Sequence, residues 1–459
     1  MIVFPRERAR SVRALARKCV AGRPRGPAPP VVFESRAGTL SVWVHTADAV
    51  LTHTAPTAGG DGVLVVPMDV LTAVEGTGDE AVELVVGEGL RGEARWSARG
   101  VSHTHPFDRI EPGKPHRPPP PPDDWHPVPP AFLTALHECG RTAGREAGRF
   151  ALTRVQVAGS AGRVAGTDGR TALIWDGFAL PFDEDLLVPA VPVFGDQTLA
   201  AGPAVRVGRT ADHLVVEVGP WRVFLTADAT GRYPDVAGAV PKHAPTVVTL
   251  DSADAAALLA AWPRLPGADV ACHPVTLAVD GGVVVRGRDE ATGAVETVRL
   301  ARPAVTGPTA RIAVDRQVLA RALALGCTTV RVADGRPVVF AGGGRTVVTM
   351  ALDPDPAAEV EPATTGIAAA DLVRIPEPVP ERRIAVRPAS NGHAAPDPPP
   401  TDPVDPVVVA EDLRAALADA AAKAGRLVAA LKSRRKEQKA LTQVWSSLKA
   451  LHLGPGGSP

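Results

Sequence analysis

Two histidines at alternate positions, His103 and His105, are the first residues of this chain whose types and spacing suggest chemistry. On a β-strand, alternate side chains lie on one face, so the two imidazoles would stand together and could bind a metal ion such as zinc. His116 follows nearby, but no cysteine and no row of carboxylates completes a ligand set. We therefore assign no metal ion and no cofactor. A hydrolase that uses His103 and His105 stays as an alternative, which metal analysis would test.

Three other patterns typical of enzymes are absent or incomplete. The acidic run Asp183-Glu184-Asp185 follows Pro181-Phe182 and indicates a solvated loop rather than paired catalytic carboxylates. The Gly-Gly-Gly-Arg segment at 342–345 lies between apolar runs and lacks the Lys-Ser/Thr of a phosphate-binding loop, so we predict a hairpin turn. There is no Gly-x-Ser-x-Gly motif. We expect a protein that is not an enzyme.

Composition sets broad limits on the class of protein. The 459 residues suffice for two to four domains, and 50 Lys and Arg balance 50 Asp and Glu. A zero net charge argues neither for nor against nucleic acid, because charge can be distributed unevenly over a surface. The four cysteines lie far apart and predict reduced, buried thiols. No apolar leader and no run of 18 apolar residues occurs, so we expect a cytoplasmic protein without membrane contact.

Residues 31–352 consist of short Val-rich runs broken by Gly, Pro and Asp, a pattern that predicts strands. Ala- and Leu-rich segments between them predict helices at about 7–19, 67–75, 130–141, 252–262 and 315–325. Asp251 and Asp315 are expected N-caps, since their carboxylates can accept free amides of the first helical turn. The elements alternate between the two types, which favours an α+β fold.

A weak internal repeat recurs at a period of roughly 120 residues. Its clearest copies are the strand-like segments at 38–42, 162–166 and 282–286. Strand pairs close each copy, for example 214–218 with 221–225. We interpret the pattern as three copies of one α+β module. The predicted boundaries are domain 1 at 1–117, a Pro-rich linker at 118–129, domain 2 at 130–245, domain 3 at 246–353, a disordered Pro-rich linker at 354–407 and a helix at 408–453.

The expected C-terminal helix is compositionally separate from the rest of the chain. Leucines and alanines recur from Leu413 to Leu448 in steps of four and three, as in a coiled coil, but Arg434 and Gln438 interrupt the apolar seam. Five of the eight lysines of the chain fall between Lys423 and Lys449. The segment can therefore be an intermolecular coiled coil or a single basic helix, and both interpretations stay open.

Two motifs are more specific than the repeat. Thr167-Asp168-Gly169-Arg170 predicts a tight hairpin, because Asp-Gly favours the backbone angles of such a turn. The segment 231–241, Gly-Arg-Tyr-Pro-Asp-Val-Ala-Gly-Ala-Val-Pro, begins about 62 residues after Gly169. Together they resemble the middle domain of the bacterial DNA polymerase III beta subunit, the DNA sliding clamp. Ala21-Gly22-Arg23-Pro24 and Val347-Val348-Thr349-Met350 add weaker support, and the resemblance covers residues 1–352.

The resemblance implies three repeated DNA-clamp domains, with antiparallel sheets outside and helices lining a ring. In that family two subunits close head to tail around duplex DNA, a loader driven by ATP places the ring, and DNA polymerase and clamp loader subunits dock on it. The ring must hold DNA without reading its sequence, so arginines that attract phosphates are expected inside it. The expected DNA-facing residues are Arg10, Arg13, Arg17, Arg23, Arg25, Arg141, Arg145 and Arg149.

The last three of these arginines recur every four residues. If their segment is helical, they form one basic stripe; Gly140, Gly144 and Gly148 indicate a helix end instead.

Partners of the family dock as extended peptides in a pocket between the second and third domains. Carried over by position, its lining is Leu152, Thr167, Gly169, Arg170, Ala172, Pro241, Val347 and Met350. The chain departs from the family at Thr171 and Ala172, where the family has a basic residue and then Leu. Losing a buried Leu removes roughly 2 kcal/mol of apolar burial. Thr104-His105-Pro106-Phe107 also replaces a Phe-Pro motif. These departures keep an alternative open: a clamp-fold scaffold outside replication that recruits partners through its C-terminal helix.

Overall fold

The computed structural model describes residues 1–23, 26–87, 89–111, 117–146, 151–200, 202, 204–267, 272–289, 292–333, 335–352 and 367–368. The chain divides into two compact units, and every described residue belongs to the first, Met1–Pro378. The predicted C-terminal helix and nearly all of the predicted linker before it lie outside the described residues.

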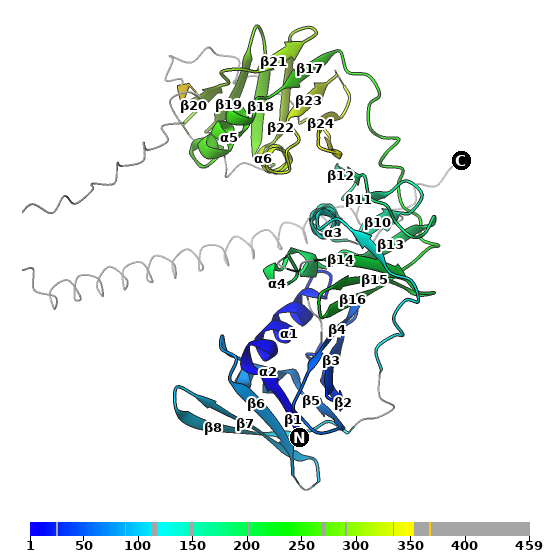
Figure 1. Cartoon of the computed structure of the whole chain (residues 1–459). Coiled ribbons are helices and arrows are strands. Elements are labelled where there is room, and N and C mark those ends of the chain that lie inside the picture. Colours follow the sequence, from blue (N-terminus) through cyan, green and yellow to red (C-terminus); the bar gives the residue numbers. More distant parts are fainter. Residues whose placement is uncertain are drawn as a thin grey trace, which may run out of the picture. The chain divides into compact units, whose positions relative to one another are not determined.

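One arrangement of elements occurs three times in succession (Figure 1). Each repeat has a strand, a helix, a group of strands, a second helix and three closing strands. The first repeat comprises β1 (Ile2–Pro5), α1 (Arg6–Lys18), β2 (Val31–Arg36), β3 (Thr39–His45), β4 (Ala49–Pro56), β5 (Gly62–Val66), α2 (Met68–Val74), β6 (Ala81–Val86), β7 (Arg91–Ala98) and β8 (Val101–Asp108).

The second and third repeats follow the same order. The second comprises β9 (His126–Val128), α3 (Ala131–Thr142), β10 (Arg154–Ala158), β11 (Arg163–Thr167), β12 (Thr171–Asp176), β13 (Asp185–Pro189), the 3-10 turn η1 (Pro192–Gly195), α4 (Gln197–Ala200), β14 (Val205–Arg209), β15 (His213–Val218) and β16 (Trp221–Thr226). The third comprises β17 (Thr246–Thr249), α5 (Ser252–Ala261), η2 (Trp262–Arg264), β18 (Pro274–Val279), β19 (Val283–Arg288), β20 (Val295–Arg299), β21 (Ala304–Thr306), β22 (Ala310–Asp315), α6 (Arg316–Ala324), β23 (Thr329–Val332), β24 (Val338–Gly342) and β25 (Arg345–Thr349). A last short strand, β26 (Ile367–Ala368), comes after the repeats.

Strand pairing joins consecutive repeats edge to edge. Strand β4 of the first repeat pairs with β16 of the second, and β12 of the second pairs with β25 of the third, both antiparallel. The resulting sheets have the orders β5-β2-β3-β4-β16-β15-β14-β9 and β13-β10-β11-β12-β25-β24-β23-β17-β21. The two terminal sheets are β1-β6-β7-β8 and β22-β18-β19-β20-β26. Main-chain hydrogen bonds therefore connect all three repeats.

Apolar periodicity explains how the helices attach to these sheets. Helix α1 buries Ala9, Val12, Leu15 and Ala16, which recur at three- and four-residue spacing and so lie on one face. The strands bury alternate valines, such as Val155 and Val157 of β10. Both sets belong to the same buried core, which leaves the opposite face of α1, with Arg10 and Arg17, exposed.

Most expected elements are confirmed. The five expected helices are α1, α2, α3, α5 and α6, and the carboxylates of Asp251 and Asp315 accept the amides of Ala253 and Gln317. The Gly-Gly-Gly-Arg segment is the hairpin turn between β24 and β25, with Gly343 and Gly344 at positive φ. Helix α4, a single turn, was not predicted because its four residues carry no periodicity.

The structure decides two expectations, one on the arginines after helix α3 and one on the cysteines. Helix α3 ends at Thr142, so Arg141 and Arg145 do not continue one helical stripe, in agreement with the helix-end interpretation of the glycines. The prediction of four buried thiols is wrong at Cys272, which is exposed, whereas Cys19, Cys139 and Cys327 are buried. Cys272 stands before β18 with φ of 62°, in a loop rather than in an element whose face is covered.

Candidate DNA interface and docking surface

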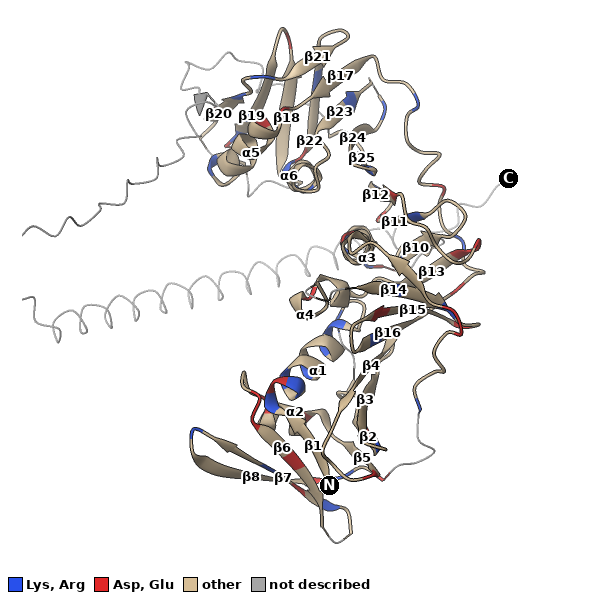
Figure 2. Ribbon diagram, in the orientation of Figure 1, with Lys and Arg blue, Asp and Glu red and all other residues tan. Residues whose placement is uncertain are grey.

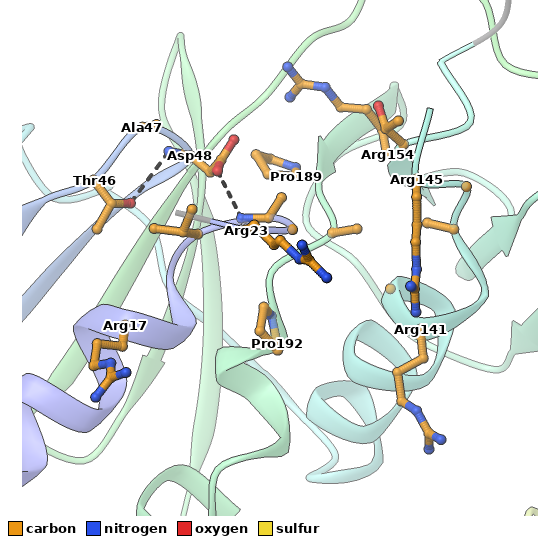
Figure 3. Close-up of a pocket in the computed structure, with 18 of the residues that line it drawn as sticks. Arg17, Arg23, Thr46, Ala47, Asp48, Arg141, Arg145, Arg154, Pro189 and Pro192 are labelled. Carbon is orange, nitrogen blue, oxygen red and sulfur yellow. Dashed lines mark hydrogen bonds between the residues drawn. The ribbon is translucent and has the colours of Figure 1, made fainter. Parts of the chain in front are cut away.

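A cavity of about 1680 Å³ gathers basic side chains from all three repeats. We call it the arginine cavity; its lining includes seven arginines and three aspartates. The arginines come from α1, from the loop after α1, from α3 and the loop after it, from β10 and from α6: Arg13, Arg17, Arg23, Arg141, Arg145, Arg154 and Arg321. Figure 3 shows several of them around the cavity, and Figure 2 shows the basic residues along α1.

Local hydrogen bonds fix the loop that presents Arg23. The carboxylate of Asp48 accepts the amide of Ala21 at 2.8 Å, and the hydroxyl of Thr46 donates to the carbonyl of Cys19 at 2.8 Å. Figure 3 shows Thr46 and Asp48 beside the Arg23 loop. Gly22 follows these anchors with φ of 76°, a conformation that favours glycine. The backbone just before Arg23 is thus held while the Arg23 side chain stays exposed.

Two of the expected DNA-facing arginines have carboxylate partners. Arg13 donates from Nε and Nη2 to the two carboxylate oxygens of Glu75, at 2.7 and 2.5 Å, so it joins α1 to the end of α2. Arg141 donates to Glu138 at 3.0 Å on its own helix. A guanidinium group that is already paired with a carboxylate attracts phosphate groups less strongly.

Arg17, Arg23 and Arg145 differ from those two. All three are exposed, and no ion pair to them occurs within the described part of the chain. Arg10 is exposed on α1 but is not among the residues lining the arginine cavity. Arg25 and Arg149 lie outside the described residues.

Glu138 links the second and third repeats. Its carboxylate accepts from Arg141 of α3 and from Nε of Arg321 of α6, the latter at 2.7 Å, and Nη2 of Arg321 donates to the Glu138 carbonyl. Burial acts to raise the pKa of Glu138, but the charges and hydrogen bonds of Arg321 and Arg141 outweigh it and lower that pKa. The carboxylate is therefore ionised and holds α3 against α6.

A second ion pair links the first repeat to the second. Lys18, at the end of α1, donates to Asp196 at 2.7 Å. Burial acts to raise the pKa of Asp196, but its hydrogen bonds with Lys18 and Thr198 lower it overall. The helices that carry the arginines are thus fixed by ion pairs between repeats.

The predicted docking residues fall into connected groups. The carbonyls of Leu152 and Thr167 both accept the amide of Gly144, at 2.8 and 3.2 Å, and the Thr167 hydroxyl accepts the amide of Gly169. Across the β12–β25 junction, the amide of Met350 donates to the carbonyl of Arg170 at 3.2 Å. Arg170 and Met350 are exposed, with Met350 at 54%. Seven of the eight residues therefore lie around the hairpin turn or on the strands of the junction, where Ala172 is opposite Val348 and Val347 is opposite Leu173.

Three of the eight residues, Ala172, Pro241 and Val347, contribute less surface. Val347 is 4% exposed and belongs to the main core, and Ala172 is 8% exposed. Ala172 packs in a separate cluster with Ile174 and Val348, against which Tyr233 and Val240 also pack. Pro241 follows Val240 at this edge and is half-buried.

The segment 231–241 packs against the cluster that contains Ala172. Val236 is buried in the same cluster as Ala172, and the Tyr233 hydroxyl donates to the carbonyl of Ala165 at 3.4 Å. Burial raises the pKa of Tyr233. Val236 and its neighbours occupy the space beside the small side chain of Ala172, which gives the alanine a packing role.

Sequence reasoning missed two arginines of the cavity, Arg154 and Arg321. Arg154 stands on β10, where no helical pattern marks it, so only proximity in three dimensions reveals it. Arg321 had a usable signal in the sequence, because it is one of two basic residues on the predicted helix at 315–325.

The sequence matches no protein-family model and no curated protein. Solved structures do match it. A DNA polymerase III subunit beta sliding clamp from Pseudomonas aeruginosa, bound to griselimycin, aligns with a TM-score of 0.62 at 16% identity, over 77% of this chain and 99% of that one. The DNA polymerase III subunit beta from Borrelia burgdorferi aligns with 0.63 at 11%, over 77% and 98%, and the beta chain from Streptococcus pneumoniae with 0.63 at 14%, over 77% and 100%. The chain has the fold of a DNA sliding clamp.

The sliding-clamp fold accounts for the three repeats and for the antiparallel sheets with few helices. At these identities the likeness is one of fold. In the described part of this clamp fold, no helix is both long and apolar enough to span a membrane, and no group of three His, Cys, Asp or Glu residues is arranged to hold a metal ion.

Proposed function

We propose that the protein is a DNA sliding clamp: two copies close head to tail around duplex DNA and hold DNA polymerase and other partners near it. Its fold supports this proposal, because whole beta subunits of DNA polymerase III align over nearly their full length. No catalytic step is part of the proposal.

The observation that carries the proposal is the repeated junction between repeats. In the first and second repeats, the outer strand of a four-stranded group pairs with the last strand of the next repeat: β4 with β16, and β12 with β25. The corresponding strands left over are β20 of the third repeat and β8 of the first. Pairing of β20 in one copy with β8 in a second copy continues the same rule, and two such contacts close a ring.

The faces of β8 and β20 restrict how they pair. At both existing junctions, buried residues lie opposite each other, as Val223 does to Leu51 and Val347 to Leu173. Phe107 of β8 and Val298 of β20 are buried, so they should share one face of the joined sheet. Residues at alternate positions then share that face too: His103 and His105 on β8, and Glu296 on β20. His103 and His105 therefore lie on the same strand face as Phe107 at the proposed ring interface.

The arginine cavity supplies the DNA contact. Arg17, Arg23 and Arg145 are exposed arginines that come from the first two repeats, and a guanidinium attracts phosphates whatever the base sequence. Such contacts are exchanged easily with water and salt, which suits a protein that must slide. Docking of an extended peptide is assigned to the exposed surface of Arg170 and Met350 beside the Asp168-Gly169 turn.

Retention on circular DNA tests the proposal. The protein, placed on nicked circles by its loader, should stay bound through a high-salt wash and leave when the circle is cut once. Equally rapid loss from circular and linear DNA would refute the proposal. A solution mass of about twice 47.5 kDa is expected for the ring.

Charge reversal tests the DNA surface separately. The triple variant Arg17→Glu, Arg23→Glu, Arg145→Glu should weaken loading and flatten its salt dependence, because each lost phosphate contact removes about one unit of the salt slope. The matched control reverses two exposed arginines that do not line the cavity, Arg36→Glu and Arg331→Glu. Equal loss in the triple variant and the control would count against the cavity as the DNA surface.

A further inference from the structure

Strand β20 already has a partner on its outer edge in the single chain. Ile367 and Ala368 form β26, which pairs parallel with β20, Val298 opposite Ile367 and Arg299 opposite Ala368 (Figure 1, short orange strand). The order of that sheet is β22-β18-β19-β20-β26, so β26 occupies the edge that the repeated junction assigns to β8 of a second copy. The two junctions between repeats are antiparallel, whereas this pairing is parallel.

One edge of a strand can serve only one neighbour at a time, because it presents a single row of amides and carbonyls. β20 has five residues, and β26 pairs with the last two of them. The chain that follows β20 is held in place: the buried carboxylate of Asp254 accepts the amides of Ala301 and Arg302, at 2.9 and 2.7 Å. Val298 and Arg299 therefore cannot pair with β26 and with a second copy at the same time.

The length of chain before β26 suits an intramolecular contact. Leu352 is anchored on β22, the opposite edge of the same sheet, by its amide, which donates to the carbonyl of Ala313 at 2.8 Å. Fourteen residues separate Leu352 from Ile367, and such a segment can reach about 50 Å when extended. Crossing the sheet from beyond β22 to beyond β20 needs only about 24 Å, five strand spacings. β26 is thus kept near β20 at an effective concentration on the order of millimolar.

We propose that the segment Ile367–Ala368 is a cap on β20 that competes, within the same chain, with β8 of a second copy and so limits ring closure. The inference rests on the proposed function, since it gives β20 its role in the ring. A cap of two residues is displaceable, because one or two net hydrogen bonds give an equilibrium constant of about ten for the pairing of β26 with β20. About one chain in ten then has a free β20 edge, and a ring requires two free edges.

The test removes the ability of the cap to pair. Full-length Ile367→Pro, Ala368→Pro loses both amides of β26. Because both copies are freed, its dimer dissociation constant should fall about 100-fold, measured by sedimentation across a dilution series. The matched control places the same change earlier in the segment, Ala357→Pro, Ala358→Pro, and should behave as the wild type. Equal dissociation constants for all three proteins would overturn the competition.

A second readout separates this inference from the proposed function. Amide exchange of β20 in dilute, monomeric protein should be faster in the Ile367→Pro, Ala368→Pro variant than in the control. Unchanged exchange overturns the cap even if the protein is a clamp. Faster exchange with unchanged self-association overturns the competition but leaves circular-DNA retention to judge the clamp. If neither protein self-associates at any concentration and neither is retained on circles, the proposed function fails, and the competition fails with it.

Discussion

Acidification should weaken the junction between the first two repeats through one buried histidine. His53 of β4 is 2% exposed and lies opposite Trp221 of β16, with ring centroids 4.4 Å apart. Arg8 of α1 donates to its imidazole at 2.9 Å, so the accepting ring nitrogen must carry no proton. Burial, and then the charge of Arg8, lower the pKa of His53 to about 3 from its usual value of 6.5.

The direction of this change in stability with pH follows from proton linkage. The unfolded chain binds a proton at His53 near pH 6.5, whereas the folded chain binds it only near pH 3. Stability is unaffected above pH 6.5 and is lost progressively as the pH falls towards 3. Each pH unit in this window costs about 1.4 kcal/mol, so lowering the pH to 5.0 should remove about 2 kcal/mol of the unfolding free energy.

The assay compares urea unfolding at pH 7.5 and pH 5.0, followed by tryptophan fluorescence. His53→Gln keeps an oxygen that can accept from Arg8 but does not titrate, so it should lose about 2 kcal/mol less than the wild type over this range. The control is His126→Gln, which changes an exposed histidine of β9 and should retain the full loss. If wild type and His53→Gln lose the same free energy, the argument from His53 is wrong.

Three further outcomes are expected. Glu138→Gln should lower the unfolding free energy by about 1.5–3 kcal/mol, because Arg321 and Arg141 lose the negative charge that binds them. The control Glu184→Gln removes an exposed ion pair with Arg209 and should change the unfolding free energy by under about 0.5 kcal/mol. Equal losses in the two variants would contradict the linking role of Glu138. Ala172→Leu should lower the unfolding free energy by about 1–3 kcal/mol, because Ala172 is 8% exposed and packs among the buried side chains of its cluster. A variant as stable as the wild type with stronger peptide binding would show instead that the alanine leaves a pocket open. Met350→Ala should weaken docking of a polymerase-derived peptide about tenfold in fluorescence anisotropy while stability stays constant, since Met350 is exposed; unchanged affinity would remove Met350 from the docking surface.

Local chemistry made much of the fold predictable. Asp251 and Asp315 mark helix starts because a carboxylate satisfies amides within two residues of itself. The Asp168-Gly169 and Gly343-Gly344 turns follow from the positive φ of Gly169, Gly343 and Gly344. These signals depend on neighbours along the chain, so the sequence contains all that they need.

The parts that could not be predicted depend on distant partners. Glu75 lies 62 residues from Arg13, and nothing near either residue indicates that they pair. The arginine-bearing segments that line the arginine cavity come from all three repeats, and they are brought together by the strand junctions and by ion pairs between repeats. The position of Arg13 on the first helix therefore suggested that it faces DNA, but it could not reveal that Glu75 already binds the Arg13 guanidinium.

Open strand edges are prone to unwanted pairing, and this chain covers most of its own. Among the described residues, Thr57 donates to the carbonyl of Val3 on β1, Ile110 donates to Val65 on β5, and Asp228 bridges to Leu187 on β13. Edge strands β9 and β21 have three residues each, too few for a long ladder. Leu352 occupies β22, and β26 occupies β20.

Strand β8 is the exception within the described part of the chain. It has eight residues, it is the outermost strand of its sheet, and no main-chain hydrogen bond to its outer edge occurs there. Pro106 removes one donor, but the exposed Val101, at 57%, leaves apolar surface on the same strand. An open edge of this length fits the ring proposed above, in which β8 pairs with a second copy. In that proposed ring, the partner of β8 is β20 of the second copy, whose edge pairs with the two-residue strand β26 in the single chain.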